Sequence, residues 1–508
     1  MEAASVPAPR DPVVVPEGSG AGDKGLKTGA ISFISNIVIA VASTAPGYSL
    51  AATLGFIVAI EGVGLQGPAV ILLAFIPMGC IAAAYNYFNR ADPDCGTTFS
   101  WVSRAMGPNI GWMAGWAVLV ADVLVMPSLA QIAGIYSFDL FGIEASTLAV
   151  TIVGVIWIIV MTAICFIGIE LSARTQQFLL GAEIITLFLF AAVALIKVYT
   201  SDPVGSIEPS LSWLNPFAID GASGLAGGIL LAIFIYWGWD SAVSVNEETE
   251  NGATASGRAA VLSTFILLGI YVVVAAAAQA FGGTQLLIDN QSDVFAPISK
   301  DVLGSPLDKL LIIAILTSAS ASTQTTILPA TRTSLSMARN KALPKTFGDV
   351  HPRYQTPSTS TIWMGAVSAI VFILLSATSQ NLIADAFTSL ALTIAFYYGI
   401  TGYACAWFYR KHLFTSAKNF LYLAFLPLLG GVILTWVFVK ACIDYSKPDG
   451  GYASPLFGIG APVIITIFMI LLGLGILITQ RINNPEFFRR KTEVVDPELA
   501  KTVTEKAS

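Results

Sequence analysis

Long runs of apolar residues alternate along the chain with short polar connectors. Twelve of these runs reach the length of about 20 residues that a helix needs to cross a lipid bilayer. They cover residues 29–58, 66–88, 109–137, 146–167, 176–198, 222–246, 258–282, 306–332, 360–378, 381–408, 418–440 and 458–482. Polar segments precede the first run and follow the last. We therefore predict an all-α integral membrane protein with twelve transmembrane helices.

The composition agrees with this pattern and excludes several classes of protein. Among 508 residues, 55% are hydrophobic and 11% are charged, whereas soluble globular domains carry about 25% charged residues. This excludes an ordinary soluble enzyme, and a net charge of −6 without a basic stripe argues against a nucleic-acid partner. Two His and five Cys without a CxxC pair offer no metal-binding set. We expect no cofactor, and we expect the cysteines to be small buried apolar residues.

The distribution of Lys and Arg predicts how the chain is oriented in the membrane. With twelve spans both tails lie on one side, and 21 of the 26 basic residues fall in the tails and connectors of that side, against five on the other. Loops that face the cytoplasm carry such an excess of basic residues. We therefore expect a multi-pass protein of the plasma membrane with both termini in the cytoplasm.

The first apolar run contains a helix-breaking sequence. Residues 43–47 read Ser-Thr-Ala-Pro-Gly, in which Pro46 lacks an amide N–H and Gly47 is conformationally free. Ser43 and Thr44 stand where a restarted helix has its N-cap. Because unpaired backbone groups are costly in lipid, a break is tolerated where a ligand or another group uses them. A proline kink without a ligand is the alternative.

The sixth run is interrupted in a similar way. Gly238 lies in the middle of the run, and Asp240 is a carboxylate about halfway along it. Such a residue is costly in the membrane and faces a cavity or a partner. A continuous helix would put Asp240, Ser244 and Glu247 on one face. The two breaks are five spans apart, which is the pattern of an inverted-repeat transporter with its site between the repeats.

This pattern predicts the domain organisation and the substrate chemistry. Residues 29–408 would form ten helices in a five-plus-five inverted repeat, with helices 11 and 12 in residues 409–482 and cytoplasmic polar tails at 1–28 and 483–508. At a broken helix, the positive N-terminal end attracts a carboxylate and freed carbonyls attract an ammonium group. A zwitterion such as an amino acid needs both.

Four ordered segments resemble the amino acid–polyamine–organocation (APC) superfamily of permeases, and the likeness extends over nearly the whole chain. The most specific segment follows the eighth run and is similar to the R-x-x-x-x-M-A-R-D-x-x-L-P loop of that superfamily. The segments are 331–344 (TRTSLSMARNKALP), 234–240 (FIYWGWD) with 246–249 (NEET), 96–101 (GTTFSW) with Gly107, Gly115 and Trp116, and 168–176 (GIELSARTQ). The resemblance implies a transporter and not an enzyme.

The resemblance also implies a substrate site at the two breaks. Backbone amides between Ser43 and Gly47 would bind the substrate carboxylate, and carbonyls near Phe234 would take its amino group. Phe234 itself stands where the superfamily carries an aromatic gate over the substrate. The implied site consists of Ser43, Thr44, Ala45, Pro46, Gly47, Phe234, Ile235, Tyr236, Gly238, Trp239 and Asp240.

Further polar residues inside the apolar runs are candidates for ion coupling. Many proton-coupled members of the superfamily carry a Lys in span 5, and Glu183 takes the corresponding position here, with a structural hydrogen bond as its alternative role. Asp122 and Asp385 are candidates for a cation site or a proton relay. Ser318 and Ser322 correspond to hydroxyls that coordinate sodium in related folds, with helix–helix hydrogen bonds as the alternative.

Together these features predict a secondary active transporter that imports an amino acid by alternating access, coupled to protons. A polyamine or amine permease, or an exchanger, is the first alternative, because four acids and no Lys lie deep in the spans. A membrane sensor that no longer transports is a more distant one. The expected partners are a small amino acid or amine substrate, a coupling proton and the lipid bilayer. Symport, exchange and uniport stay open, as does the oligomeric state, for which a homodimer is one option.

Overall fold

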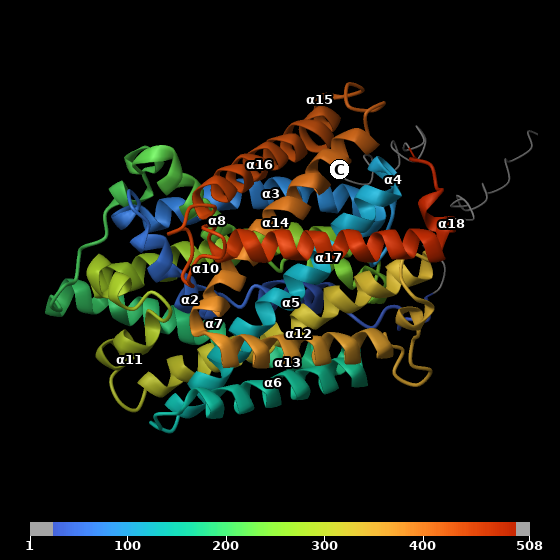
Figure 1. Cartoon of the computed structure of the whole chain (residues 1–508). Helices are drawn as coiled ribbons and strands as arrows, with labels where there is room; N and C mark the ends of the chain where they lie inside the picture. Colours follow the sequence, from blue (N-terminus) through green and yellow to red (C-terminus); the bar gives the residue numbers. More distant parts are fainter. Residues whose placement is uncertain (1–23, 494–508) are drawn as a thin grey trace, which may run out of the picture.

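The computed structural model describes residues 24–493, which are mostly helical and contain isolated β-bridges but no β-strand (Figure 1). Eleven helical segments are long and apolar enough to cross a membrane, and each overlaps one predicted span. They are α1–α2 (Phe33–Ser43 and Pro46–Ala59), α3 (Gly67–Ala91), α5 (Pro108–Asp139), α6 (Thr147–Ile167), α7 (Ile169–Ser201), α10 (Gly252–Asp289), α12 (Asp308–Arg339), α13 (Ser358–Thr378), α14 (Gln380–Phe408), α16 (Leu426–Tyr445) with the turns before it, and α17 (Ala461–Asn483). The shorter helices are α4 (Thr98–Met106), α8 (Gly221–Tyr236), α9 (Ser241–Ser244), α11 (Phe295–Leu303), α15 (Ala417–Asn419) and α18 (Pro485–Phe488). Most of the two predicted tails, 1–28 and 483–508, lies outside the described residues.

The sixth predicted span is interrupted, as its sequence indicates. α8 has 16 residues, fewer than the about 20 that cross a bilayer, and α9 restarts after a turn. In place of the twelve predicted helices, the described chain therefore holds eleven segments long enough to span the membrane and one shorter, interrupted segment. Among the eleven, α1–α2 is also broken. The expected common face of Asp240, Ser244 and Glu247 is wrong, because α9 ends at Ser244 and Glu247 lies in a separate 3₁₀ turn.

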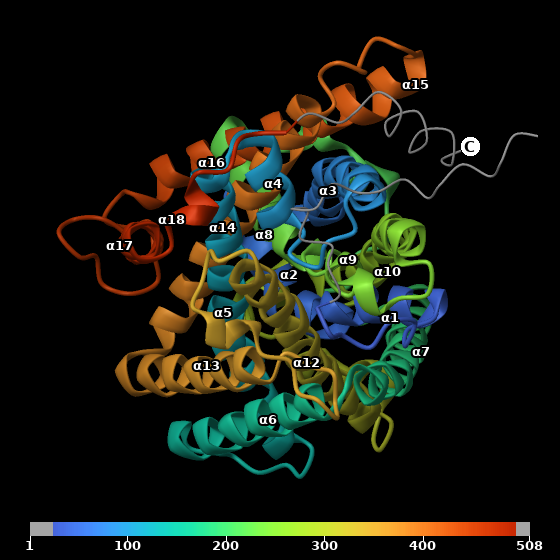
Figure 2. The ribbon, with the colours of Figure 1, turned by 90° about the vertical axis from the view of Figure 1, so that its right-hand side faces the viewer.

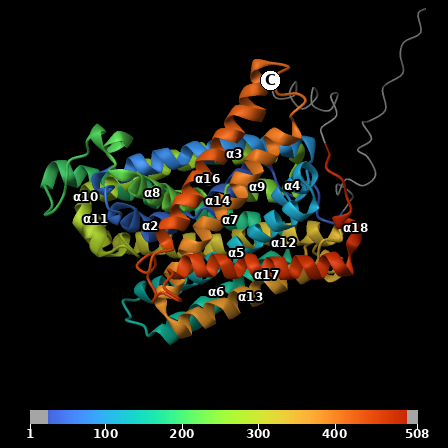
Figure 3. The ribbon, with the colours of Figure 1, turned by 45° about the horizontal axis from the view of Figure 1, so that its top comes forward.

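The helices run side by side, with a shielded centre and an outer ring. In the view along the helices, α5 and α12 lie inside, whereas α6, α13, α17 and α7 lie at the edge (Figure 2). Figure 3 shows α17 on the outside of the bundle, where it contacts α14 and α5. In the most apolar part of α12, 83% of the residues are buried, against 22% in α6. Ile152, Ile156 and Ile159 are among the exposed residues of α6, which fits a helix that faces lipid.

Both ends of the described chain lie at the same end of the helix bundle, which we call the termini side. Lys24 Nζ lies 3.0 Å from Asp94 Oδ2 in the connector after α3, and the Glu493 N–H donates to the Arg104 carbonyl of α4 at 2.7 Å. The opposite end, which holds α11, is called the α11 side (Figure 1).

A buried cluster links segments on the termini side. Lys24 Nζ lies 3.0 Å from Asp94 Oδ2 and 2.5 Å from Glu247 Oε1, and it donates to Cys95 Sγ at 3.6 Å. Although burial lowers it, the carboxylates of Asp94 and Glu247 raise the pKa of Lys24 well above its ordinary value, so the ammonium group stays charged. These four residues, the termini-side cluster, tie the N-terminal segment to the connectors after α3 and after α9.

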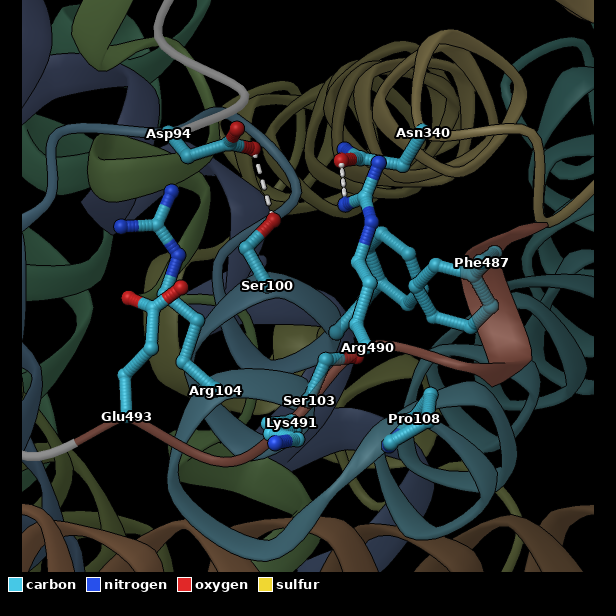
Figure 4. A pocket seen from close by; sticks show the side chains of 11 residues that line it. Asp94, Ser100, Ser103, Arg104, Pro108, Asn340, Phe487, Arg490, Lys491 and Glu493 are labelled. Atoms are coloured by element: carbon cyan, nitrogen blue, oxygen red, sulfur yellow. Dashed lines mark hydrogen bonds between the residues drawn. The ribbon is translucent and has the colours of Figure 1, made fainter. Parts of the chain in front are cut away.

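The C-terminal segment covers the same side of the molecule. Phe487 of α18 is buried and packs on Phe99 of α4, with 5.5 Å between the ring centroids. Arg490 Nη1 donates to Asn340 Oδ1 at 2.6 Å. Figure 4 shows Arg490 and Asn340 on one side of a small pocket and Asp94 on the other. The C-terminal segment thus joins α17 to α4 and to the connector after α12.

Candidate transport site

The first span breaks at Thr44 and Ala45, where its sequence predicts a break. α1 ends at Ser43, Ala45 adopts the left-handed conformation (φ 45°, ψ 68°), and α2 begins at Pro46. Proline is favoured in the first turn of a helix because it has no N–H to leave unpaired. The N-terminal end of α2 therefore lies inside the bundle, where its partial positive charge can bind an anion.

A carboxylate of the protein itself occupies this helix end. The Gly47 N–H donates to Glu183 Oε1 at 2.7 Å, and Ser318 Oγ donates to the same oxygen at 2.7 Å. The Tyr48 N–H donates to Ser318 Oγ at 3.2 Å. Glu183 is fully buried, and its second oxygen, Oε2, has no hydrogen-bond partner. In this state a side chain fills the place where a substrate carboxylate is expected.

The second break lies against the first. Gly238 has a φ of 119°, which favours glycine. A Cβ at this position would lie 2.8 Å from the carbonyl carbon and oxygen of Ser43. The hydroxyls of Ser43 and Ser241 hydrogen-bond across the contact at 2.8 Å. Glycine therefore lets the two broken segments meet and form one site.

A small cavity of about 10 Å³, here called the break cavity, lies beside this contact. It has room for about one water molecule. Asp122 of α5 and Asp240 both line it, and Asp122 Oδ2 has no hydrogen-bond partner. Its lining residues are all buried: Ser43, Val118, Asp122, Trp237, Gly238, Asp240, Ser241, Thr326, Pro329 and Tyr397.

The rings of Phe234, Phe387 and Tyr48, here called the aromatic layer, lie between the break cavity and a vestibule on the α11 side. The vestibule has a volume of about 420 Å³, and Leu231 and Phe387 are part of its wall. Phe234 lies one helical turn from Leu231 and about one turn from Trp237, which lines the break cavity. Its ring centroid is 4.1 Å from that of Phe387 and 6.4 Å from that of Tyr48. Phe234 thus lies where a gate between the two spaces would lie.

Substitution of Phe234 by Ala is expected to impair transport more than substitution of Phe190 by Ala. Both rings are buried, but Phe190 packs on Phe295 at 5.2 Å, apart from the vestibule and the break cavity. Truncation costs about 3–5 kcal/mol of stability at either site, and only Phe234→Ala also joins the two spaces. Uptake into proteoliposomes, normalised to folded protein, measures the difference. Equal losses in the two variants would remove the special role of Phe234.

The other side chains of the predicted site lie in two places. Gly238 and Asp240 line the break cavity. Tyr236 and Trp239 pack between helices instead, because the Tyr236 hydroxyl donates to the Ile71 carbonyl at 3.2 Å and Trp239 stacks on Tyr398 at 5.1 Å. The structure therefore brings only part of the predicted pocket wall to the cavity.

Several backbone groups expected to meet a substrate have protein partners. The Ala45 N–H donates to the Ala42 carbonyl at 3.1 Å. The Ile235 carbonyl accepts a hydrogen bond from the Tyr271 hydroxyl. A substrate that uses these groups has to replace those bonds.

Asp385 lies apart from the break cavity. Its two carboxylate oxygens accept the N–H groups of Tyr452 and Ala453, each at 2.8 Å. These residues belong to the connector between α16 and α17, so Asp385 holds that connector against α14.

The wall residues that the sequence analysis missed include Val118, Thr326, Pro329 and Tyr397. Tyr397 accepts a hydrogen bond from Trp237 Nε1. No charge or helix break marks these positions, although two adjacent tyrosines in an apolar run, Tyr397 and Tyr398, were an available signal.

The membrane-length helices and the two broken segments in contact, with a buried cavity beside them, form the arrangement of a multi-pass membrane transporter. The family model described as "Amino acid permease" matches residues 30–469. The chain therefore belongs to the amino acid permease family of the APC superfamily, as its motifs indicate, and the named relatives are transporters and not enzymes.

Relatives of known name transport different substrates. The branched-chain amino acid permease BcaP of Lactococcus lactis is 24% identical over 324 residues, which cover 60% of this chain and 68% of that protein. The low-affinity putrescine importer PlaP of Escherichia coli K12 is 24% identical over 382 residues, which cover 73% and 80%. The crystal structure of MhsT in complex with L-phenylalanine has a TM-score of 0.57 at 15% identity and covers 80% of this chain and 98% of that one. The last likeness shows that the fold is shared.

Proposed function

We propose that the protein imports an amino acid across the plasma membrane by alternating access, coupled to protons. Its family and its likeness to BcaP support an amino acid substrate. The observation that carries the coupling is the position of Glu183. Its carboxylate joins the N-terminus of α2 to Ser318 of α12 and keeps one oxygen without a partner.

A proton on Glu183 would change the contacts of three helices. The charged carboxylate accepts hydrogen bonds from Gly47 and Ser318 and is attracted by the positive end of α2. The protonated acid loses that attraction, and one of its oxygens becomes a donor. Protonation therefore loosens α2 from α7 and α12 and releases the Gly47 amide for a substrate carboxylate.

The two ends of the molecule support a direction of transport. The vestibule reaches the aromatic layer from the α11 side, while the termini-side cluster holds the opposite end together. We assign the termini side to the cytoplasm because most basic residues fall in its connectors and tails. The substrate then enters through the vestibule and leaves after the cluster separates. In this proposal residues 29–408 are the transport core, and residues 409–482 add two helices to it.

Sodium coupling has less support from the geometry than proton coupling. Ser318 Oγ donates to Glu183, and Ser322 Oγ donates to the Ser43 carbonyl at 3.0 Å. Both hydroxyls therefore serve contacts between helices, and a sodium ion would have to take their place.

An amine permease is the second candidate function. The amides of Gly47 and Tyr48 already have partners, whereas Asp122 and Asp240 bring two acids to a cavity whose wall has no basic residue. The likeness to the putrescine importer PlaP supports this candidate as well.

Thermal stabilisation of the purified protein by a ligand panel tests the substrate class. A ligand that binds the folded state stabilises it by about 2.7 kcal/mol at a hundredfold excess over Kd. We expect the melting temperature to rise with an amino acid and to stay unchanged with its decarboxylated amine, which lacks the group that α2 attracts. A rise with diamines alone would favour the amine permease. No rise with any amino acid or amine would contradict both candidates.

A further inference from the structure

Two acidic side chains from different helices meet in the break cavity. Asp122 comes from α5, and Asp240 comes from the turn between α8 and α9. Their side chains are almost wholly buried, at 1% and 5% exposed. Because both residues line the same cavity of about 10 Å³, a cation in it would be attracted by both carboxylates.

The protein supplies no cation of its own to this pair. None of the lining residues of the break cavity is basic. The Lys and Arg side chains that are buried in the described chain, Lys24 and Arg332, have other acidic partners. Asp122 Oδ2 is buried without any hydrogen-bond partner. Because an unpartnered carboxylate in a membrane protein is costly, such a group fits a site that a ligand completes.

The rest of the wall suits an organic cation better than a metal ion. Trp237 and Tyr397 present aromatic rings, and the hydrogen bond from Trp237 Nε1 to the Tyr397 hydroxyl holds them together. Aromatic rings attract ammonium groups. Val118 and Pro329 add apolar surface, whereas calcium or magnesium requires about six oxygen ligands.

We propose that Asp122 and Asp240 together bind a terminal ammonium group of the substrate. This inference rests on the proposed transport function and names its substrate class. The substrate carries a primary ammonium group at the end of a flexible chain, as a basic amino acid or a diamine does. The cavity has room for about one water molecule, which is close to the size of one ammonium group.

The first experiment compares lysine with norleucine, which has the same carbon chain and lacks the terminal amino group. Both compete with radiolabelled lysine for uptake into proteoliposomes that contain the full-length protein. We expect lysine to compete at least about tenfold more strongly than norleucine, since binding the pair of carboxylates requires the charge. Equal competition by norleucine and lysine would overturn the inference without any variant.

A second arm identifies the source of the ammonium group. Cadaverine differs from lysine only by the absence of the carboxylate. Strong competition by lysine alone supports a basic amino acid, which agrees with the proposed function. Strong competition by cadaverine supports a diamine, and the ammonium site stands in either case.

The variants Asp122→Asn and Asp240→Asn test the two residues. Each is expected to reduce the preference for lysine over norleucine by roughly tenfold or more. Asp385→Asn is the matched control, because Asp385 is a buried acid outside the cavity, and its preference should match that of the native protein. A preference for lysine that survives in both folded variants would overturn the inference. This holds even if proton-driven uptake is lost in those variants, because the two acids would then act as a proton relay and not as a binding site.

Failure of this inference and failure of the proposed function give different results. Uptake of neutral amino acids without any advantage for a terminal ammonium group contradicts the inference alone. The absence of uptake for every amino acid and amine contradicts the proposed function, and the inference falls with it.

Discussion

Proton-driven uptake is expected to fall to background when Glu183 is replaced by Gln. Glutamine keeps an oxygen that can accept hydrogen bonds from Gly47 and Ser318, which lie 2.7 Å from Glu183 Oε1 in the native protein. It cannot take up or release a proton, so a pH gradient no longer drives the cycle. The measurement is uptake of labelled substrate into proteoliposomes with an acidic outside, beside exchange of substrate without a gradient.

The exchange assay separates loss of coupling from loss of folding. Exchange should persist in Glu183→Gln, because the uncharged glutamine resembles the protonated acid, the form that leaves the Gly47 amide free for the substrate. Glu170→Gln is the matched control on the same helix, since Glu170 is exposed and lies 2.8 Å from Lys27 at the surface. Normal proton-driven uptake in Glu183→Gln would contradict the proposed coupling. A wild-type protein driven by sodium and indifferent to pH would contradict it too.

The largest loss of stability is expected from substitution of Glu248 by Ala. Arg332 Nε and Nη2 donate to the two carboxylate oxygens of Glu248, both at 2.9 Å, and the side chains are 1% and 0% exposed. The substitution leaves a buried guanidinium group without its acid, which costs about 3–5 kcal/mol. The midpoint of heat or denaturant unfolding of the purified protein measures this loss.

A surface ion pair provides the control for this loss. Glu486 pairs with Lys341, and the two side chains are 68% and 59% exposed, so Glu486→Ala should change the midpoint little. The double variant Glu248→Leu with Arg332→Met should recover most of the lost stability, because it removes both buried charges. Similar losses for Glu248→Ala and Glu486→Ala would show that burial of the pair has no such effect.

The spans and both breaks could be predicted because lipid constrains the sequence strongly. A helix in lipid needs about 20 apolar residues, so the run at 360–378 locates α13 (Ser358–Thr378) within two residues. Pro46 and Gly238 mark the breaks because a proline removes a backbone hydrogen bond and suits the first turn of a new helix, and a glycine permits a positive φ.

The contents of the site depend on contacts between helices, which no periodicity records. The partner of the Gly47 amide is Glu183, 136 residues away on another helix. Tyr397 joins the cavity wall because it reaches Trp237 from α14. Glu247 leaves the face of Asp240 because the helix stops three residues earlier. Sequence patterns therefore located both helix breaks and singled out Asp122, Asp240 and Glu183, but they did not reveal which groups touch.

The termini-side cluster encloses a thiol that can report on the state of the molecule. Cys95 is fully buried, with Lys24 Nζ donating to its Sγ and its Sγ donating to the Arg332 carbonyl, both at 3.6 Å. In the proposed transport cycle, separation of Lys24 from its acids would uncover this sulfur. Of the other four cysteines, three are buried and one is partly buried. In the proposed transport cycle, the rate at which Cys95 is alkylated would therefore measure how often the termini side opens.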